Sequence, residues 1–440
     1  MQHRQKLERP FFFAFLLFTS CFMLFPVRAE EAAPVHLTLQ QAREIALRQH
    51  PRISVAVLVT LAAKESMKEA RAAFMPNVYG SVTAVDNTDP NNTRIAAGGL
   101  NNPIIYEREA EGVTVSQLIT DFGRTWELTK SAKFRAKAEE MNLEATQEQI
   151  LVEVDNAFFS SLSAQSVLAV AEQTLKTRGL SLEQTQSLAT NQMRSSLDVS
   201  FASVDYDQAK ILLAKAESDL KASFAVLATL LADRRPETFV LSDVAMPASI
   251  TNGVPDLILE ALAQRPDLAR LRYQREAARD FASAEGKLLY PTLSAMGVAG
   301  LIPNGNSHLG PDYAAAGVNL NLPIFTGGLY TARRRAADYE AKEADETLRD
   351  EEDNVVRDVQ VTKLDLDYAL QRVGLTEQLL TNANTALELA QARFKSGISS
   401  IVELSQAEVN QTSAQIAEAD ARYQYQIQHS MLEFQLGRLH

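Results

Sequence analysis

The sequence repeats one series of motifs, so the chain is expected to fold as two similar units. Matching residues lie 215 positions apart in the first part of each unit and 205 positions apart in the second part. Four pairs of residues define the match: Pro51 and Pro266, Pro76 and Pro291, Gly123 and Gly328, and Asp198 and Glu403. Because the four matches occur in the same order, chance similarity is a poor explanation.

The change of offset falls in one loop. Residues 86–106 of the first unit form a long polar stretch, whereas the second unit has only residues 303–311 at that place. An insertion confined to a loop is typical of a duplicated domain, because loops tolerate changes in length. The sequence therefore predicts a first unit at residues 30–236, a linker at 237–255 and a second unit at 256–440.

Each unit is predicted to begin with a helix and two strands. The helices cover residues 38–74 and 255–289, where apolar residues recur with helical spacing and a proline follows. Polar and small apolar residues then alternate, as in half-buried strands, over residues 77–85, 111–119, 292–301 and 314–324. Each strand has about ten residues, the length that a tilted strand needs to cross a bilayer. A soluble antiparallel hairpin remains the alternative for each pair.

A long helical hairpin is predicted to follow in each unit. No proline interrupts residues 124–235 or 330–440, and mostly apolar residues recur there at alternating four- and three-residue steps, as in coiled coils. Gly397, with Gln192 at the matching position, indicates a tight turn between two antiparallel helices. A helix over residues 124–190 would be about 100 Å long at 1.5 Å per residue. Such a length is typical of a spacer or a tube wall.

The N-terminal segment has the features of a secretory signal peptide. Three basic residues precede an apolar run, and a small-residue site ends at Ala29, so residues 1–29 are predicted to be removed. Cys21, the only cysteine, is the alternative processing site, because residues 18–21 loosely resemble the cleavage site of a lipoprotein. Phe18 and the apolar residues that follow Cys21 argue against this alternative.

Charge and hydropathy argue against two classes of protein. The formal net charge is −12, and loss of four basic residues and one acid with the signal peptide would make it −15. Nucleic-acid binding is not expected, because it needs a basic surface. No apolar run of the mature chain is long enough to cross a bilayer as a helix. Contact with a membrane would therefore be through strands. Since the smallest closed barrels have eight strands, a four-strand chain must either oligomerise or keep its strands out of a membrane.

Three motifs make the mature chain resemble the TolC family of outer-membrane efflux proteins. They are residues 115–124 (VSQLITDFGR), 322–328 (LPIFTGG) and 397–407 (GISSIVELSQA). The resemblance implies a mainly α fold with a β-barrel portion. Long antiparallel coiled-coil hairpins would form a periplasmic tunnel, and each protomer of a homotrimer would give four strands to a twelve-stranded outer-membrane barrel. Residues 237–255 would lie in the equatorial region of the tunnel.

The same resemblance implies a function and a set of partners. The trimer would be a passive conduit from the periplasm to the exterior, gated at its periplasmic tip, with no enzymatic activity and no cofactor. A periplasmic adaptor (membrane fusion protein) and an inner-membrane transporter of the RND, ABC or MFS type would complete an efflux pump or a type I secretion system. The sequence does not distinguish these two systems. A periplasmic coiled-coil adaptor or scaffold without a barrel is the alternative function.

By this resemblance, the functional site lies at the hairpin turns. Glu403 matches an acid at the periplasmic mouth, where three copies would form a ring around the pore entrance. Two such charges about 8 Å apart repel by about 0.5 kcal/mol in water and about 2 kcal/mol at an effective dielectric constant of 20. The ring would favour cations. Gln406 replaces a second acid of the family, one turn further along the helix.

Other family members hold the closed tip with an arginine and a tyrosine near the second turn. Ser399 and Phe394 occupy those positions here, and Asp198 matches the acid that such a pair would bind. Together with Gly397 these residues define the predicted gating region, in which the bonds typical of the family are expected to be absent. The alternative is that Glu403 and Asp198 are ordinary solvated charges of a coiled coil.

No motif for catalysis or metal binding was found in the sequence. The six histidines show no paired spacing typical of a metal site. Arg333, Arg334 and Arg335 form a short basic run that is predicted to be a solvated helix face near the membrane end.

Overall fold

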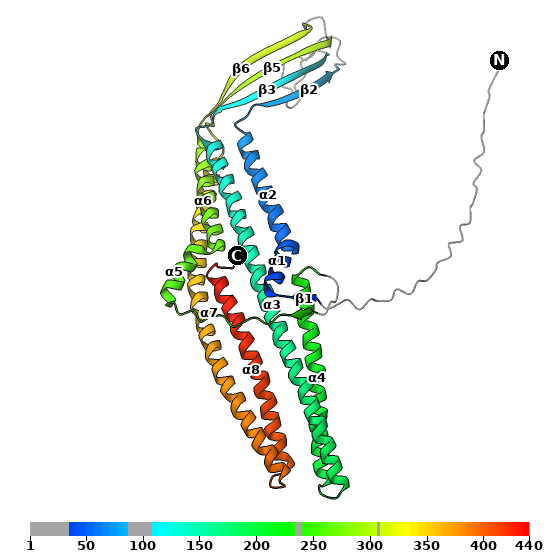
Figure 1. The fold of residues 1–440 in the computed structure, drawn as a ribbon. Coiled ribbons are helices and arrows are strands. Elements are labelled where there is room, and N and C mark those ends of the chain that lie inside the picture. The colour runs from blue at the N-terminus through cyan, green and yellow to red at the C-terminus, as the bar shows by residue number, and fades with distance from the viewer. Residues whose placement is uncertain (1–34, 87–107, 234–238, 306–308, 440) are drawn as a thin grey trace, which may run out of the picture.

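The computed structural model describes residues 35–86, 108–233, 239–305 and 309–439. The predicted signal peptide, Cys21 and nearly all of the polar loop 86–106 lie outside these residues. The molecule is elongated, with a β-sheet at one end and long helices that run to the opposite end (Figure 1). Helices dominate the fold, as predicted.

The sheet contains the four predicted strands. They are β2 (Asn77–Val85), β3 (Arg108–Thr120), β5 (Thr292–Gly305) and β6 (Asp312–Asn321), in the antiparallel order β2-β3-β5-β6. β6 ends before Pro323, three residues earlier than predicted, since proline has no amide hydrogen to donate to a neighbouring strand. β2 and β6 are the two edges of the sheet, and within the described ranges each pairs with a single strand.

The register places side chains of different character on the two faces of the sheet. Residues paired across antiparallel strands point to the same face. The face that we call the aliphatic face carries Val78, Val82, Val113, Val115, Leu293, Ala295, Ala316 and Val318, with Glu109, Glu111 and Asp312 at the end far from the helices. The polar face carries Tyr79, Ser81, Thr114, Ser116, Ser294 and Asn319, together with the apolar Met296 and Val298 of β5. This alternation is typical of membrane-spanning barrels, in which the apolar face meets lipid.

The helix before each strand pair differs from the prediction, because each is broken in two. α1 (Leu39–Gln49) and α2 (Pro51–Ala72) replace the single helix 38–74. α5 (Val254–Gln264), α6 (Pro266–Gly286) and the 3₁₀ turn η2 (Lys287–Leu289) replace the helix 255–289. The residues between the helices are extended, with φ −68° and ψ 125° at His50 and φ −60° and ψ 124° at Arg265. A proline follows each, and proline disfavours the helical conformation of the residue before it.

Two long hairpins form the other end of the molecule. α3 (Arg124–Thr190) and α7 (Leu329–Lys395) have 67 residues each, while their partners α4 (Ser196–Leu230) and α8 (Ile401–Gln435) have 35 each. The predicted helix over residues 124–190 is confirmed. The equal lengths are the structural counterpart of the sequence duplication. Among the described residues, no helix has both the length and the apolar character needed to cross a membrane.

A large cluster of buried apolar side chains combines helices of the first unit with Tyr423 of the second hairpin, and these elements meet at mid-height of the molecule (Figure 1). β1 (Val35–Leu37) pairs in parallel with β4 (Phe239–Leu241), at the start of the predicted linker. Further along the linker, the backbone carbonyls of Val244 and Pro247 accept hydrogen bonds from Gln426 and Tyr425 of α8, at 3.2 and 3.3 Å. The linker is therefore packed against the second hairpin.

Candidate functional site

The two hairpin turns lie at the end of the molecule farthest from the sheet (Figure 1). A serine caps the second helix of each hairpin. Ser195 Oγ accepts a hydrogen bond from the Asp198 amide at 3.2 Å, and Ser400 Oγ accepts one from the Glu403 amide at 3.4 Å. The tight turn predicted at Gly397 is present, with φ +73°, and Gln192 has φ +58° at the matching position. Gln192 therefore holds a backbone conformation that normally favours glycine.

Asp198 closes its own capping box. Its Oδ2 accepts a hydrogen bond from the Ser195 amide at 3.1 Å. Within the described part of the chain, no bond joins the Asp198 carboxylate to the second hairpin.

Glu403 is paired with a cation of its own hairpin. Arg393 Nε lies 3.2 Å from Glu403 Oε1, and the two side chains are 54% and 43% exposed. Such a pair contributes about 0–1 kcal/mol to stability. The positive charge of Arg393 nevertheless offsets the negative charge that Glu403 presents at this turn. Gln406, one turn further along, donates a hydrogen bond to Asn410 Oδ1 at 2.9 Å.

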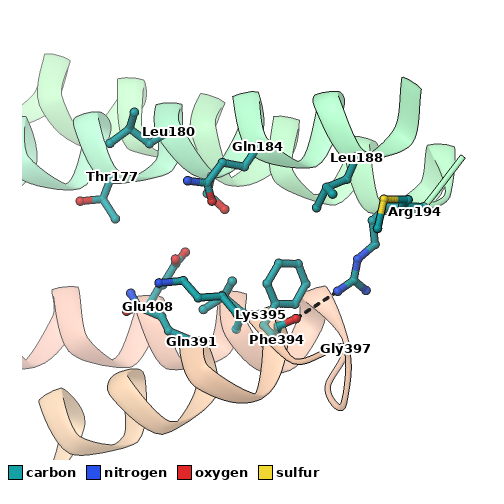
Figure 2. Close-up of a pocket in the computed structure, with 13 residues that line it drawn as sticks. Thr177, Leu180, Gln184, Leu188, Arg194, Gln391, Phe394, Lys395, Gly397 and Glu408 are labelled. Atoms are coloured by element: carbon teal, nitrogen blue, oxygen red, sulfur yellow. Dashed lines mark hydrogen bonds between the residues drawn. The ribbon is translucent and has the colours of Figure 1, made fainter. Parts of the chain in front are cut away.

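A residue that the sequence analysis missed, Arg194, connects the two turns. Its guanidinium carbon lies 4.2 Å from the centre of the Phe394 ring, and its Nη2 donates a hydrogen bond to the Phe394 carbonyl at 3.3 Å. Figure 2 shows Arg194 reaching from the first hairpin to Phe394 on the second. Phe394 therefore takes part in a contact between the hairpins. The arginine of this contact comes from the first turn, whereas the family resemblance implied an arginine near the second turn.

A second link, also missed, lies further from the tip. Arg178 Nη1 of α3 is 3.2 Å from Asp205 Oδ2 of α4 and 2.7 Å from Glu408 Oε2 of α8. Arg178 and Glu408 are buried, 5% and 7% exposed. Burial raises the pKa of the Glu408 carboxyl, the Arg178 charge opposes this shift, and the Asp205 charge adds to it. Arg178 continues the alternating four- and three-residue spacing of the mostly apolar residues in this helix, and this position was the signal of burial that the sequence offered.

A cavity of about 590 Å³ lies between these two links. Its wall combines apolar side chains with the amides of Gln184 and Gln391 (Figure 2). Ser399, two residues after Gly397 of the cavity wall, is 8% exposed, and its Oγ has no hydrogen-bond partner within the described residues. The space shows that the hairpin tips are joined by a few polar contacts and are not closely packed.

The described residues contain no group of three or more His, Cys, Asp or Glu side chains placed to hold a metal ion.

Comparison with known proteins gives the family. The family model described as outer membrane efflux protein matches residues 42–233 and 257–438. Outer membrane protein TolC of Vibrio cholerae serotype O1 is 25% identical over 391 residues, which cover 86% of this chain and 85% of that protein. A membrane protein from Pseudomonas aeruginosa has a TM-score of 0.81 at 22% identity, over 91% of this chain and 93% of the other. The outer membrane protein VceC from Vibrio cholerae has a TM-score of 0.78 at 19% identity, over 91% and 96%. Because the family model matches most of the sequence, this chain belongs to the outer membrane efflux protein family.

Proposed function

We propose that three copies of this chain form a passive conduit through the outer membrane, without enzymatic activity. The observation that carries the proposal is a four-stranded sheet with one aliphatic face and two edges that have no partner strand among the described residues. An open sheet edge in lipid leaves backbone groups unpaired. Three sheets joined at β2 and β6 would supply twelve strands, which exceeds the eight of the smallest closed barrels.

The long hairpins would form the tunnel that continues this barrel into the periplasm. Helices of 67 residues are about 100 Å long, enough to reach far below the membrane. The partners that we propose are a periplasmic adaptor at the tunnel and an inner-membrane transporter of the RND, ABC or MFS type, which would supply the energy. The cargo would pass through without chemical change.

The entrance gate would lie at the hairpin tips. The links Arg194–Phe394 and Arg178–Glu408 would hold the second hairpin against the first and would have to break when the tip opens. Glu403 and Arg393 would set the charge of the entrance together. These contacts would take the place of the tip bonds expected from other members of the family.

The proposal is tested with the full mature chain, purified in detergent and added to planar bilayers. We expect the mass of three chains and stepwise ion conductance. A chain that is monomeric, remains in solution without detergent and gives no conductance would contradict the proposal. That result would instead favour a periplasmic adaptor or scaffold.

A further inference from the structure

The helical layer directly below the sheet has two faces of different charge. A cavity of about 1000 Å³ is lined by residues of α2, α3, α6 and α7, among them Glu69, Leu128, Arg135, Phe281 and Glu340. We call this side the hollow face. An α-helix turns by about 100° per residue, so side chains two or five positions from a hollow-face residue point to the opposite side.

The opposite face of the layer is basic near the sheet. Three exposed basic side chains lie on this face. Arg71 of α2 lies two residues from Glu69, and Lys133 of α3 lies two residues from Arg135. Arg335 of α7 lies five residues from Glu340. None of the three makes an ion pair within the described part of the chain, although the protein as a whole has a net charge of −12. Unpaired cations on three helices of one layer in an acidic protein indicate attraction to an external anionic surface.

The only tryptophan of the chain lies on the same basic face. Trp126 is in the first turn of α3, two residues from Leu128 of the hollow face, and its side chain is 60% exposed. Next to this turn, the rings of Phe122 and Tyr290 stack at 5.8 Å and are each 54% exposed. Exposed aromatic side chains are concentrated where a membrane protein meets the headgroup region, because their rings are amphipathic or apolar.

We propose that Trp126, Arg71, Lys133 and Arg335 form a collar that binds the anionic headgroups of phospholipids in the inner leaflet of the outer membrane. The inference rests on the proposed channel. The hollow face carries the cavity and would face the lumen, so the basic face would point outward. α3 is flanked by α2 and α6 of its own chain, so no helix of a second copy can cover Trp126 and Lys133 in a single-layer wall.

The heights of these residues fit the headgroup region. Trp126 lies about 3 Å and Lys133 about 14 Å below the first residue of α3 along its axis, at 1.5 Å per residue. The headgroup region adds about 5–7 Å on each side of the hydrocarbon core, and charges interact over a further 8 Å or so at physiological salt. Side chains of a helix tilt toward its N-terminus, and the N-termini of α3 and α7 are at the membrane end. Lys133 and Arg335 are therefore directed toward the bilayer.

Trp126 provides the first test, because its fluorescence is the only tryptophan signal of the chain. The mature protein is inserted into phosphatidylcholine vesicles that carry bromine, a quencher, either near the headgroup or at the chain ends. We expect strong quenching by shallow bromine and weak quenching by deep bromine. Conductance is measured on the same vesicles fused to planar bilayers. Conductance without quenching by either lipid would overturn the collar alone, whereas absence of conductance would contradict the channel itself.

The second test asks whether the cations select anionic lipid. In vesicles that mix the two lipids, we expect brominated phosphatidylglycerol to quench Trp126 about twice as strongly as brominated phosphatidylcholine. The variant Arg71→Gln, Lys133→Gln, Arg335→Gln should remove this difference. A control with the same loss of charge, far from the sheet on the first hairpin, combines Lys176→Gln, Lys215→Gln and Lys221→Gln. Equal lipid preference in the variant that lacks the three collar cations and in the control would overturn the proposal.

Discussion

At the scale of single residues, the charge of the entrance depends on Glu403 and Arg393 together. Replacing Glu403 by Gln would leave three unpaired arginines around the mouth of a trimer. We therefore expect Glu403→Gln to shift the permeability ratio toward anions by about twofold to thirtyfold, from a repulsion of about 0.5–2 kcal/mol. Arg393→Gln is the matched control and should shift the ratio toward cations. The reversal potential across a bilayer under a salt gradient measures both, and equal potentials in the two variants would contradict the role of the pair.

Arg194 is the residue whose loss should most directly loosen the tip. Arg194 makes a cation–π contact with the Phe394 ring and a charged hydrogen bond to the Phe394 carbonyl. Together these contacts stabilise the closed tip relative to the open tip by about 1–2 kcal/mol. Arg194→Gln should therefore raise the open fraction of single channels about fivefold to thirtyfold. Lys395→Gln removes a nearby exposed charge without touching this link and should leave the open fraction unchanged. Equal effects of the two variants would show that only net charge matters.

At the scale of single elements, the two hairpin turns have different residues at the position where the backbone is left-handed, Gln192 in the first turn and Gly397 in the second. Gln192 holds a left-handed conformation that costs a non-glycine residue about 1–2 kcal/mol, whereas Gly397 adopts the same turn without this cost. Gln192→Gly should slow hydrogen exchange of the Met193 amide, which bonds to the Leu188 carbonyl at 2.9 Å, by about fivefold. Gly397→Gln should speed exchange of the Ile398 amide by a similar factor. Unchanged exchange in both would mean that the turns open independently of backbone strain.

The contact of α8 with α3 and α4 should respond to pH through Glu408. Burial raises the pKa of Glu408 above 4.5, so the closed tip binds this proton more tightly than an open tip in which Glu408 meets water. The proton-linked stability of the closed tip is complete at pH values below about 4.5 and is lost as pH rises through the raised pKa. The open fraction of single channels should therefore increase with pH over this range. The Glu408→Gln variant should show no such increase, and a wild-type response of opposite sign would contradict the assignment.

The elements were predicted better than their contacts. Coiled-coil spacing and the absence of proline were sufficient to predict α3, because a long helix depends on local sequence. The breaks at His50 and Arg265 were not predicted, since a proline inside an apolar-periodic stretch is also compatible with a kinked helix. The links made by Arg194 and Arg178 join residues 200 or more positions apart, and no local pattern in one sequence specifies such partners.

At the scale of the whole molecule, the outer membrane position follows from the family, and the tunnel extends from it into the periplasm. The family resemblance inferred from three motifs is confirmed by the match to the family model. Each region of the elongated molecule has a distinct chemistry: an alternating sheet, a basic collar below it, a packed equator, and polar links at the tip.

The two faces of the sheet permit a test of which side meets lipid. Val115 and Thr114 are neighbours near the middle of β3, on the aliphatic and polar faces respectively. An arginine that faces lipid at the midplane of a bilayer costs about 2–4 kcal/mol, whereas one in a water-filled lumen costs little. Val115→Arg should therefore lower the yield of membrane-inserted trimer by about thirtyfold to a thousandfold, and Thr114→Arg should insert like the wild type. The yield is measured as heat-sensitive trimer on gels after insertion into vesicles. Because both variants add the same charge to adjacent positions, the opposite order of yields would mean that the aliphatic face does not meet lipid.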